Sequence, residues 1–329
     1  MSRFSFVDEG AHIPGDDHLW QESQIFIWWD ERQQIGGLQR VGHIPNQHKA
    51  NYWHGLMTGE GYRYLTDVHG LPLTADDRDA RGLASGGQSM RALDERRGSI
   101  DFADDNTELH LRYQDFYPMD EVWEQGTGGH VEAEMAAAHF ETSGRVTGNV
   151  RIGEQIIDVD GMFHRDHSWG PRDWEYLTGH RWVVGTAGPQ FSFSSATMLG
   201  NQDLVSGGYV IRNGKRYQAE LLDIVIGIEP DNVTARNATV TWQLAGGETV
   251  IIDCEPVGGW MFGHGNYLES DQLGHFQVRG EDITGWCDIE MSMNHRLHNQ
   301  PVRLAVAAAL KQGVTQARDR VGLFEVLAR

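Results

Sequence analysis

The sequence predicts an all-β fold of short antiparallel strands that form barrels or sandwiches. In many segments apolar residues occupy every second position, as they do in a strand with one buried face. The 40 glycines stand between short apolar runs, where they mark turns and bulges. Long segments with helical periodicity are nearly absent, so many short strands at regular spacing are the expected architecture.

The strongest single turn signal is Asn213-Gly214. Both residues accept positive φ, which a two-residue hairpin turn requires, and they stand between strands expected at 208–212 and 215–219. The remaining strands are predicted at residues 24–29, 52–57, 62–67, 89–94, 108–114, 145–152, 155–162, 181–186, 191–198, 224–228, 239–244, 249–253, 274–279 and 286–293, with turns at Gly153-Glu154 and Gly246-Gly247.

Two segments are expected to be helical, namely 131–138 and a C-terminal tail over 303–327 that internal glycines interrupt. The strand pattern is coarsely doubled along the chain, and no linker rich in Pro or Ser separates the halves. We expect an N-terminal unit over residues 1–174 and a C-terminal unit with the helical tail over 175–329.

Size and charge limit the classes of function. The 329 residues are enough for two domains, and 40% apolar and 22% charged residues are normal for a globular protein. The formal net charge of −20 argues against nucleic acids and anionic membranes as partners. Residues 1–17 contain no apolar signal-peptide core, and no apolar run is long enough to span a bilayer. We expect a cytoplasmic protein that does not insert into a membrane and that can form oligomers. Cys254 and Cys287 are expected to be reduced thiols in the core.

One segment, from His164 to Trp174, concentrates polar and aromatic side chains. Within eleven residues it holds two His, two Asp, two Arg and two Trp. Such a mixture is hard to bury as plain core, because every buried charge needs a partner. One interpretation is a structural ion-pair network at a strand-to-loop corner, with Asp166 paired to Arg172. The other is the polar end of an apolar pocket.

In the second interpretation Asp166 is a proton donor. Desolvation beside His167, under the shield of Trp side chains, disfavours the charged carboxylate, so the acid can protonate an alkene or a leaving hydroxyl. The faces of Trp169 and Trp174 can stabilise a developing cation through their quadrupoles.

Residues outside this segment are secondary candidates. Trp286, Asp288 and Glu290 share one face of a predicted strand, where Glu290 would be a second acid or base; a solvated strand face is the alternative. The stretch from Trp260 to His264 combines aromatic and polar side chains, which fits a pocket rim or a core. An aromatic wall, or simple core packing, is expected for Trp28, Trp29, His43, Trp53 and His54.

Motifs of several other enzyme classes are incomplete or missing. The run that starts at His164 begins like a kinase catalytic loop, but Pro171 stands where that loop needs Asn. No Gly-rich nucleotide loop and no GxSxG serine elbow occurs, so no cofactor is expected. His164 and His167 would lie on opposite faces of a strand, and nothing local demands a metal.

The run Asp166-His167-Ser168-Trp169-Gly170-Pro171-Arg172, preceded by Gly161 and followed by Asp173-Trp174, resembles the AttH/CrtC-like superfamily. That group includes carotenoid 1,2-hydratase, kievitone hydratase and lipocalin-like cyclases. The N-terminal runs Trp20–Ser23, Trp28–Asp30 and Arg40–Asn46 are similar to an uncharacterised branch of it.

The resemblance implies two lipocalin-like β-barrel units, a hydrophobic pocket and acid chemistry without a cofactor. The positions that match the signature are Asp166, His167 and Trp169. With the candidates above, the expected catalytic residues are Asp166, His167 and Glu290, and the expected substrate-binding residues are Trp169, Arg172, Trp174, Arg165, Trp286 and His264.

Three functions compete. The first is a lyase (hydratase or dehydratase), isomerase or cyclase of a small terpenoid, steroid or polyketide-like substrate. There Asp166 is the acid, His167 orients it or relays its proton, and Arg165 or Arg172 sets the charge of the Asp or anchors a substrate carboxylate. The second is a non-catalytic carrier of a hydrophobic ligand, which needs a pocket but no acid. The third is a metal-dependent enzyme with His ligands from several strands.

Overall fold

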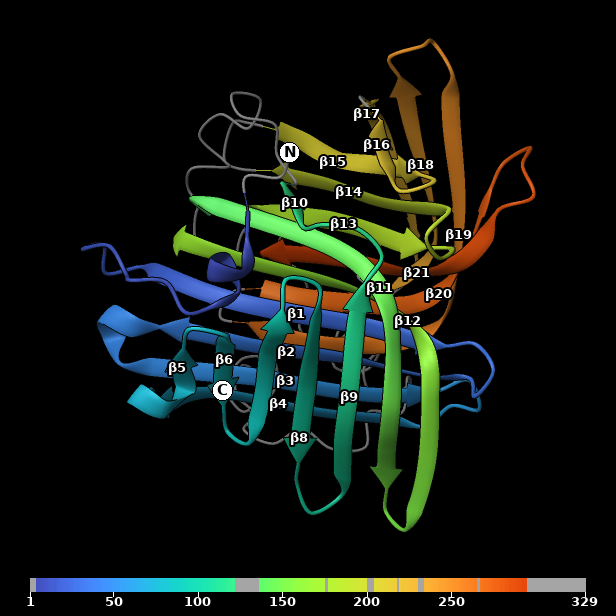
Figure 1. Ribbon diagram of the computed structural model, residues 1–329. Helices are drawn as coiled ribbons and strands as arrows, with labels where there is room; N and C mark the ends of the chain where they lie inside the picture. The colour runs from blue at the N-terminus through green and yellow to red at the C-terminus, as the bar shows by residue number, and fades with distance from the viewer. Residues whose placement is uncertain are drawn as a thin grey trace.

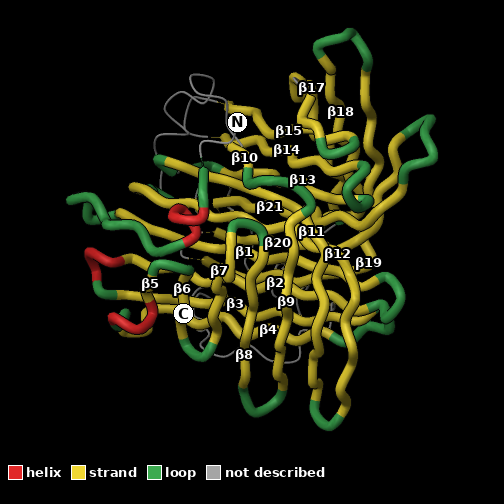
Figure 2. Tube along the Cα trace, viewed as in Figure 1, coloured by secondary structure: helices red, strands yellow, loops and turns green. Residues whose placement is uncertain are grey.

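The computed structural model describes residues 4–121, 136–174, 177–199, 204–217, 219–229, 234–264 and 267–294. Strands form two antiparallel sheets, one a half-barrel and the other a nearly closed barrel (Figure 1). The only helical segments of the described chain are three short 3-10 turns, drawn in red in Figure 2. They are η1 (Phe6–Glu9), η2 (Pro45–Gln47) and η3 (Ala75–Asp77). The all-β prediction is confirmed.

The first sheet contains the N-terminal strands in the order β4-β3-β2-β1-β12-β11-β9-β8-β7-β6-β5, and the short β10 also pairs with β11. Their bounds are β1 (Trp20–Asp30), β2 (Ile35–Ile44), β3 (Lys49–Thr58), β4 (Arg63–Pro72), β5 (Arg78–Asp79), β6 (Gly82–Ser85), β7 (Gln88–Asp94), β8 (Arg97–Ala103), β9 (Thr107–Asp115), β10 (Asp120–Glu121), β11 (Ala138–Ile152) and β12 (Gln155–Pro171).

The second sheet has nine strands in the order β16-β15-β14-β13-β21-β20-β19-β18-β17. Its last strand, β17, lies beside β15, which brings the two edges of the sheet together. The bounds are β13 (Gly179–Thr186), β14 (Phe191–Leu199), β15 (Leu204–Arg212), β16 (Lys215–Tyr217), β17 (Ala219–Ile228), β18 (Ala235–Leu244), β19 (Thr249–His264), β20 (Tyr267–Val278) and β21 (Thr284–Asn294).

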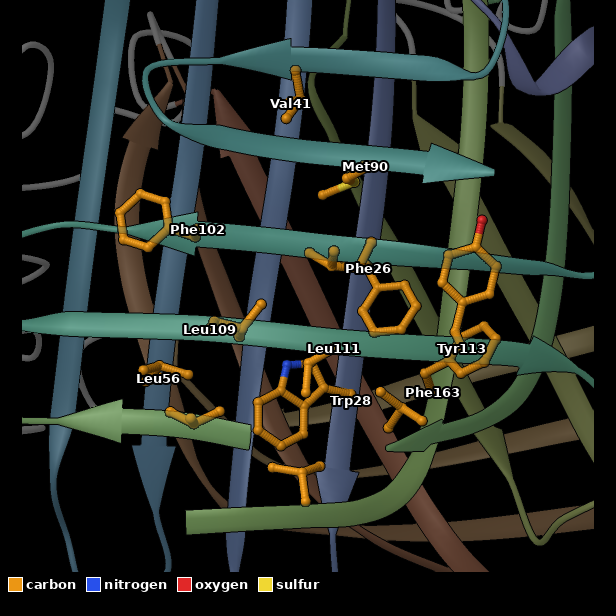
Figure 3. Close-up of a cluster of buried hydrophobic side chains, with 14 of the residues drawn as sticks. Phe26, Trp28, Val41, Leu56, Met90, Phe102, Leu109, Leu111, Tyr113 and Phe163 are labelled. Carbon is orange, nitrogen blue, oxygen red and sulfur yellow. The ribbon is translucent and has the colours of Figure 1, made fainter. Parts of the chain in front are cut away.

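The first sheet folds over on itself around an apolar core. Strands β8 and β9 cross in front of β1–β4 (Figure 1), and the long strands β11 and β12 connect the two layers. The side chains between the layers include Phe26, Trp28, Phe102 and Phe163, all buried (Figure 3). Phe26 and Phe163 are stacked, with ring centroids 4.6 Å apart. Because Phe163 of β12 belongs to this core, the face of β12 that carries Phe163 points away from the second sheet.

A separate apolar layer lies where the two sheets meet. The first sheet contributes Trp29 and Trp53, and the second contributes Trp182 and Trp260. The indole N–H of Trp260 donates to the carbonyl of Tyr64 at 2.9 Å, which ties β19 to β4. The interface between the sheets is therefore aromatic and well packed, and it frames the pocket described below.

The predicted turns are confirmed by strand register. Asn213 and Gly214 have φ of 52° and 70° and join Arg212 to its partner Lys215. Gly153, with φ of 58°, begins the turn between β11 and β12. Gly247 has φ of 86° in the turn before β19.

Strand β2 was not predicted because its sequence shows no alternation. Nine of its ten residues are buried, since one face meets the folded-over layer and the other meets the second sheet. A strand covered on both faces loses the period-two signal. Gly36 and Gly37 also weakened the prediction of a strand. Close packing explains the glycine at position 37, because a Cβ there would lie 2.6 Å from the indole nitrogen of Trp28.

The expectation of a helix over 131–138 is wrong where it can be examined, because Ala138 begins β11 and residues 136–137 are not helical. Residues 131–135 and the tail over 303–327 lie outside the described residues. The described chain passes from the first sheet to the second between Pro171 and Gly179, while the domain boundary itself stays a prediction.

In the described part of the chain, no helix has the length and apolar character to cross a membrane.

Candidate functional site

The segment from His164 to Trp174 comprises the last part of strand β12, up to Pro171, and the first loop residues after it, so its expected place at a strand-to-loop corner is confirmed. As successive side chains of a strand point to opposite faces, the segment divides into two sets. Arg165 and His167 point with Phe163 away from the second sheet, whereas His164 and Asp166 point toward it. Residues that are neighbours in sequence therefore belong to different environments.

Arg165 is held in a buried ion-pair triad. Its guanidinium donates to Glu9 at 2.7 and 2.9 Å and to Asp115 at 2.7 and 3.1 Å, and it lies over the ring of Tyr113. Burial raises the pKa of Asp115 to about 6, even though the charge of Arg165 opposes that shift. Arg165 thus anchors the N-terminal segment to the first sheet, and it does not line the pocket.

His167 contacts Glu22 rather than Asp166. Its Nε2 lies 3.1 Å from Oε1 of Glu22, and Nδ1 of His12 lies 2.6 Å from the same oxygen. Burial alone would raise the pKa of Glu22, but the hydrogen bonds from the two histidines lower it to about 2. The hypothesis that His167 orients Asp166 is wrong, because the two side chains leave opposite faces of β12. Trp169 stacks on His12, with centroids 3.6 Å apart.

A pocket opens between the two sheets, with an empty volume of about 790 Å³ that includes its mouth. The space inside it that can hold the centres of water-sized groups is about 90 Å³. Its walls are apolar and aromatic side chains, and acids and cations are grouped among them. The lining residues are Ser23, Ile25, Arg40, Trp53, Ala136, His139, Asp166, Ser168, Arg172, Trp174, His180, Arg181, Trp182, Ala196, Met198, Glu269 and Glu290.

Asp166 lines this pocket from β12. Its Oδ2 lies 3.0 Å from Nε2 of His139 on β11, and its Oδ1 accepts the backbone N–H of Ile25 at 3.1 Å. No described ion pair joins Asp166 to Arg172, so this expected pairing is wrong, although other residues of the segment do belong to buried ion-pair networks. Sequence analysis missed His139, which lies 27 residues earlier and meets Asp166 only through strand pairing.

A second His–carboxylate pair faces the pocket from the other sheet. His180 Nε2 makes a very short hydrogen bond to Glu290, and the Ser292 hydroxyl lies 2.5 Å from His180 Nδ1. Burial lowers the pKa of His180, but the charge and hydrogen bond of Glu290 outweigh it and raise the value above normal. The alternative of a solvated face for Glu290 and Asp288 is wrong, because both side chains are buried.

Glu269 on β20 is the acid that sequence analysis missed. It is buried, lines the pocket, and has a pKa raised to about 8 by desolvation and by the neighbouring charge of Glu290. Asp271 and Asp288, deeper in the same layer, also have pKa values raised by burial and by Glu290. The sequence did contain a signal for this acidic site: two strands carry acidic residues at every second position. These residues are Glu269 and Asp271 in one strand and Asp288 and Glu290 in the other.

Two arginines approach the pocket from the first sheet side. Nη1 of Arg40 donates to Oδ1 of Asn51 at 2.5 Å, and its guanidinium lies 4.4 Å from the ring centre of Trp53. Arg172 donates to the hydroxyl of Ser168 at 2.7 Å and lies over the ring of Trp174. Burial lowers the pKa values of both arginines, that of Arg172 to about 10.

The remaining expected site residues have different positions. Trp174 lines the pocket, and its indole N–H donates to Gln21 at 3.3 Å. Trp286 packs in the layer between the sheets and borders a second groove instead. The backbone of His264 ends β19, and its side chain lies outside the described residues. Cys254 and Cys287 are buried free thiols, as expected.

Among the described residues, two groups place three potential metal-ligand atoms within 4.8 Å of one another. The first is His12, Glu22 and His167. The guanidinium of Arg78 also donates to Glu22 at 3.1 Å, as does the backbone N–H of His12 at 3.0 Å, so this carboxylate already has four hydrogen-bond partners. The second is Asp271, Asp288 and Glu290, which belongs to the acidic layer described above. Neither group is assigned as a metal site.

Fold and site together define a class of two-sheet β proteins with an acid-lined apolar pocket between the sheets. The chain belongs to the family described as a domain of unknown function, DUF7064, whose model matches residues 6–295. No curated protein sequence matches this chain.

Solved structures share the fold at low sequence identity. An AttH protein from Nitrosomonas europaea is 12% identical with a TM-score of 0.66, over 88% of this chain and 96% of that one. CghA bound to Sch210972 is 13% identical with a TM-score of 0.64, over 89% and 96%. Kievitone hydratase from Nectria haematococca is 9% identical with a TM-score of 0.58, over 88% and 98%. The resemblance to this lipocalin-like superfamily is thus confirmed at the level of the fold.

Proposed function

We propose that this chain is a cofactor-independent acid–base enzyme, a hydratase or dehydratase, isomerase or cyclase, that acts on a hydrophobic molecule between the two sheets. The observation that carries the proposal is that Glu269 and the Asp166–His139 pair face one Trp-walled cavity from opposite sheets. Since the pKa of Glu269 is about 8, this acid keeps its proton at neutral pH. The names of two structural relatives, kievitone hydratase and CghA, support a reaction of this class.

In the proposed reaction Glu269 donates its proton to an alkene carbon or to a leaving hydroxyl. The resulting cation lies against the faces of Trp53 and Trp182, whose quadrupoles stabilise it. In hydration, water adds to the cation and loses one proton to Asp166, which His139 orients. Loss of a neighbouring C–H proton to Asp166 instead gives an isomer, and if a second alkene of the substrate first attacks the cation and forms a C–C bond, the same proton loss gives a closed ring. One proton is given and one is taken, and no redox partner is required.

The test is solvent deuterium incorporation. Pools of terpenoids, steroids and polyketides are incubated with the protein in D2O, and products are followed by mass spectrometry. We expect deuterium in the product, or gain or loss of one water molecule, and we expect Asp166→Asn to reduce the rate by about 10²-fold or more. Asp158→Asn changes an exposed carboxyl on the same strand and is the matched control.

Equal conversion by wild type and Asp166→Asn would remove Asp166 from the mechanism. Saturable binding of a pool component with neither deuterium incorporation nor gain or loss of water would instead favour the non-catalytic carrier, since a carrier needs the same cavity but no proton transfer.

A further inference from the structure

Arg40 is a buried cation whose charge no neighbouring carboxylate neutralises directly. Only 3% of its surface is exposed, and it borders the pocket. Its partners are the neutral amide of Asn51 and the ring of Trp53. Within the described ranges, no ion pair within 4.0 Å involves this guanidinium. A buried charge without an opposite charge in contact is costly unless a ligand supplies one.

Arg172 adds a second guanidinium to the same wall. Its hydrogen bonds to Ser168 and Ser23 are with neutral hydroxyls. Burial is the main cause of its lowered pKa, and the next is the positive charge of Arg40. Both guanidinium groups border the same pocket, and the charge of Arg40 disfavours that of Arg172, so an anion between them would stabilise both.

The charge balance of the pocket favours one bound monoanion. Three carboxyl groups line the pocket, and the raised pKa of Glu269 disfavours its charged form, which leaves the carboxyl groups of Asp166 and Glu290. Three arginines line the same pocket and outnumber these two carboxyl groups; they are Arg40, Arg172 and Arg181. A phosphate dianion would be repelled by the two carboxylates more strongly than a carboxylate would.

We propose that the ligand of this pocket is an amphipathic carboxylic acid, whose carboxylate binds Arg40 and Arg172 while its apolar body packs against Trp53, Trp174 and Trp182. The planar fork of a guanidinium suits a carboxylate, and the aromatic walls suit a hydrophobic body. This inference rests on the proposed function for the choice of pocket, and it adds the class of substrate. An acid anchored at the arginines presents its carbon skeleton to Glu269 and Asp166.

The experiment compares acids with the alcohols of the same skeleton. The probes are dodecanoic acid with dodecan-1-ol, and dehydroabietic acid with dehydroabietinol, titrated at pH 7 while tryptophan fluorescence is followed. We expect each acid to bind about ten- to a hundredfold more tightly than its alcohol, the size expected for hydrogen bonds between charged groups. Arg40→Met should remove this preference, Arg40→Lys should keep part of it, and Arg236→Met, at an exposed position on β18, should keep all of it.

Several results would overturn the proposal. The first is that the wild-type protein binds acid and alcohol with equal affinity, a result that needs no variant. The second is that neither acid binds saturably. An unchanged acid preference in folded Arg40→Met would also overturn the assignment to Arg40. Binding is measured without turnover. Acid preference without any conversion in the D2O experiment would therefore contradict only the proposed enzyme, and conversion without acid preference would contradict only this inference.

Discussion

Glu269→Gln is expected to reduce turnover by about 10²- to 10⁴-fold, the usual contribution of a general acid. Glutamine keeps the size of the side chain but has no proton to donate to an alkene or a hydroxyl. At pH values above 7, the same substitution should raise the melting temperature, because it removes a buried carboxyl group that resists ionisation. Loss of activity and gain of stability from one change is typical of a strained catalytic group.

The sign of the stability effect follows from linkage. The folded-state pKa of Glu269 is about 8, above the ordinary 4.5, so the folded state holds a proton that the unfolded chain has released. The stabilisation from that proton is complete below pH 4.5 and is lost as the pH rises through 8. The groups that act on this carboxyl include Glu290, His180, Arg40 and Asp67.

Melting temperatures of wild type and Glu269→Gln should therefore diverge progressively between pH 5 and pH 9. The control is Glu255→Gln, which alters an exposed carboxyl on the adjacent strand β19 and should leave the pH dependence unchanged. Parallel pH curves for wild type and Glu269→Gln would contradict a neutral Glu269 in the folded protein.

Arg165→Met is expected to lower the free energy of unfolding at pH 8 by about 3–5 kcal/mol. The substitution leaves the carboxylates of Glu9 and Asp115 buried without their shared cation. Since the pKa of Asp115 is already about 6 with Arg165 present, its removal favours protonation further. The loss of stability should therefore be smaller at pH 5 than at pH 8.

Denaturant unfolding at the two pH values measures this effect. Arg145→Met breaks an exposed ion pair with Asp160, at 2.8 Å, and should cost less than about 1 kcal/mol at either pH. An Arg165→Met protein as stable as the Arg145→Met control would show that the triad does not hold the N-terminal segment in place.

The sequence indicated part of the pocket because the end of β12 and the loop after it carry several of the residues that line it. Asp166, Arg172 and Trp174 lie within a short segment, and the alternation in β21 pointed to Glu290. Closeness in the sequence also led to a wrong prediction, since the residues on either side of Asp166 point to the opposite face of the strand. That is why Arg165 and His167 are in other networks.

The missed residues share one cause. His139, Arg40 and Glu269 come from β11, β2 and β20, and only the order and register of the strands bring them to one cavity. Strand pairing over such separations leaves no mark in local periodicity. The burial of β2 on both faces removed the remaining signal for Arg40.

The most direct test of the account is the titration of glutamate carboxyl groups by NMR, in protein labelled with ¹³C at the glutamate carboxyl carbon. One resonance should titrate with a midpoint near pH 8 and should be missing from Glu269→Gln. Spectra in which every glutamate has ionised below about pH 6 would contradict a neutral acid in the pocket, and with it the proposed proton donor.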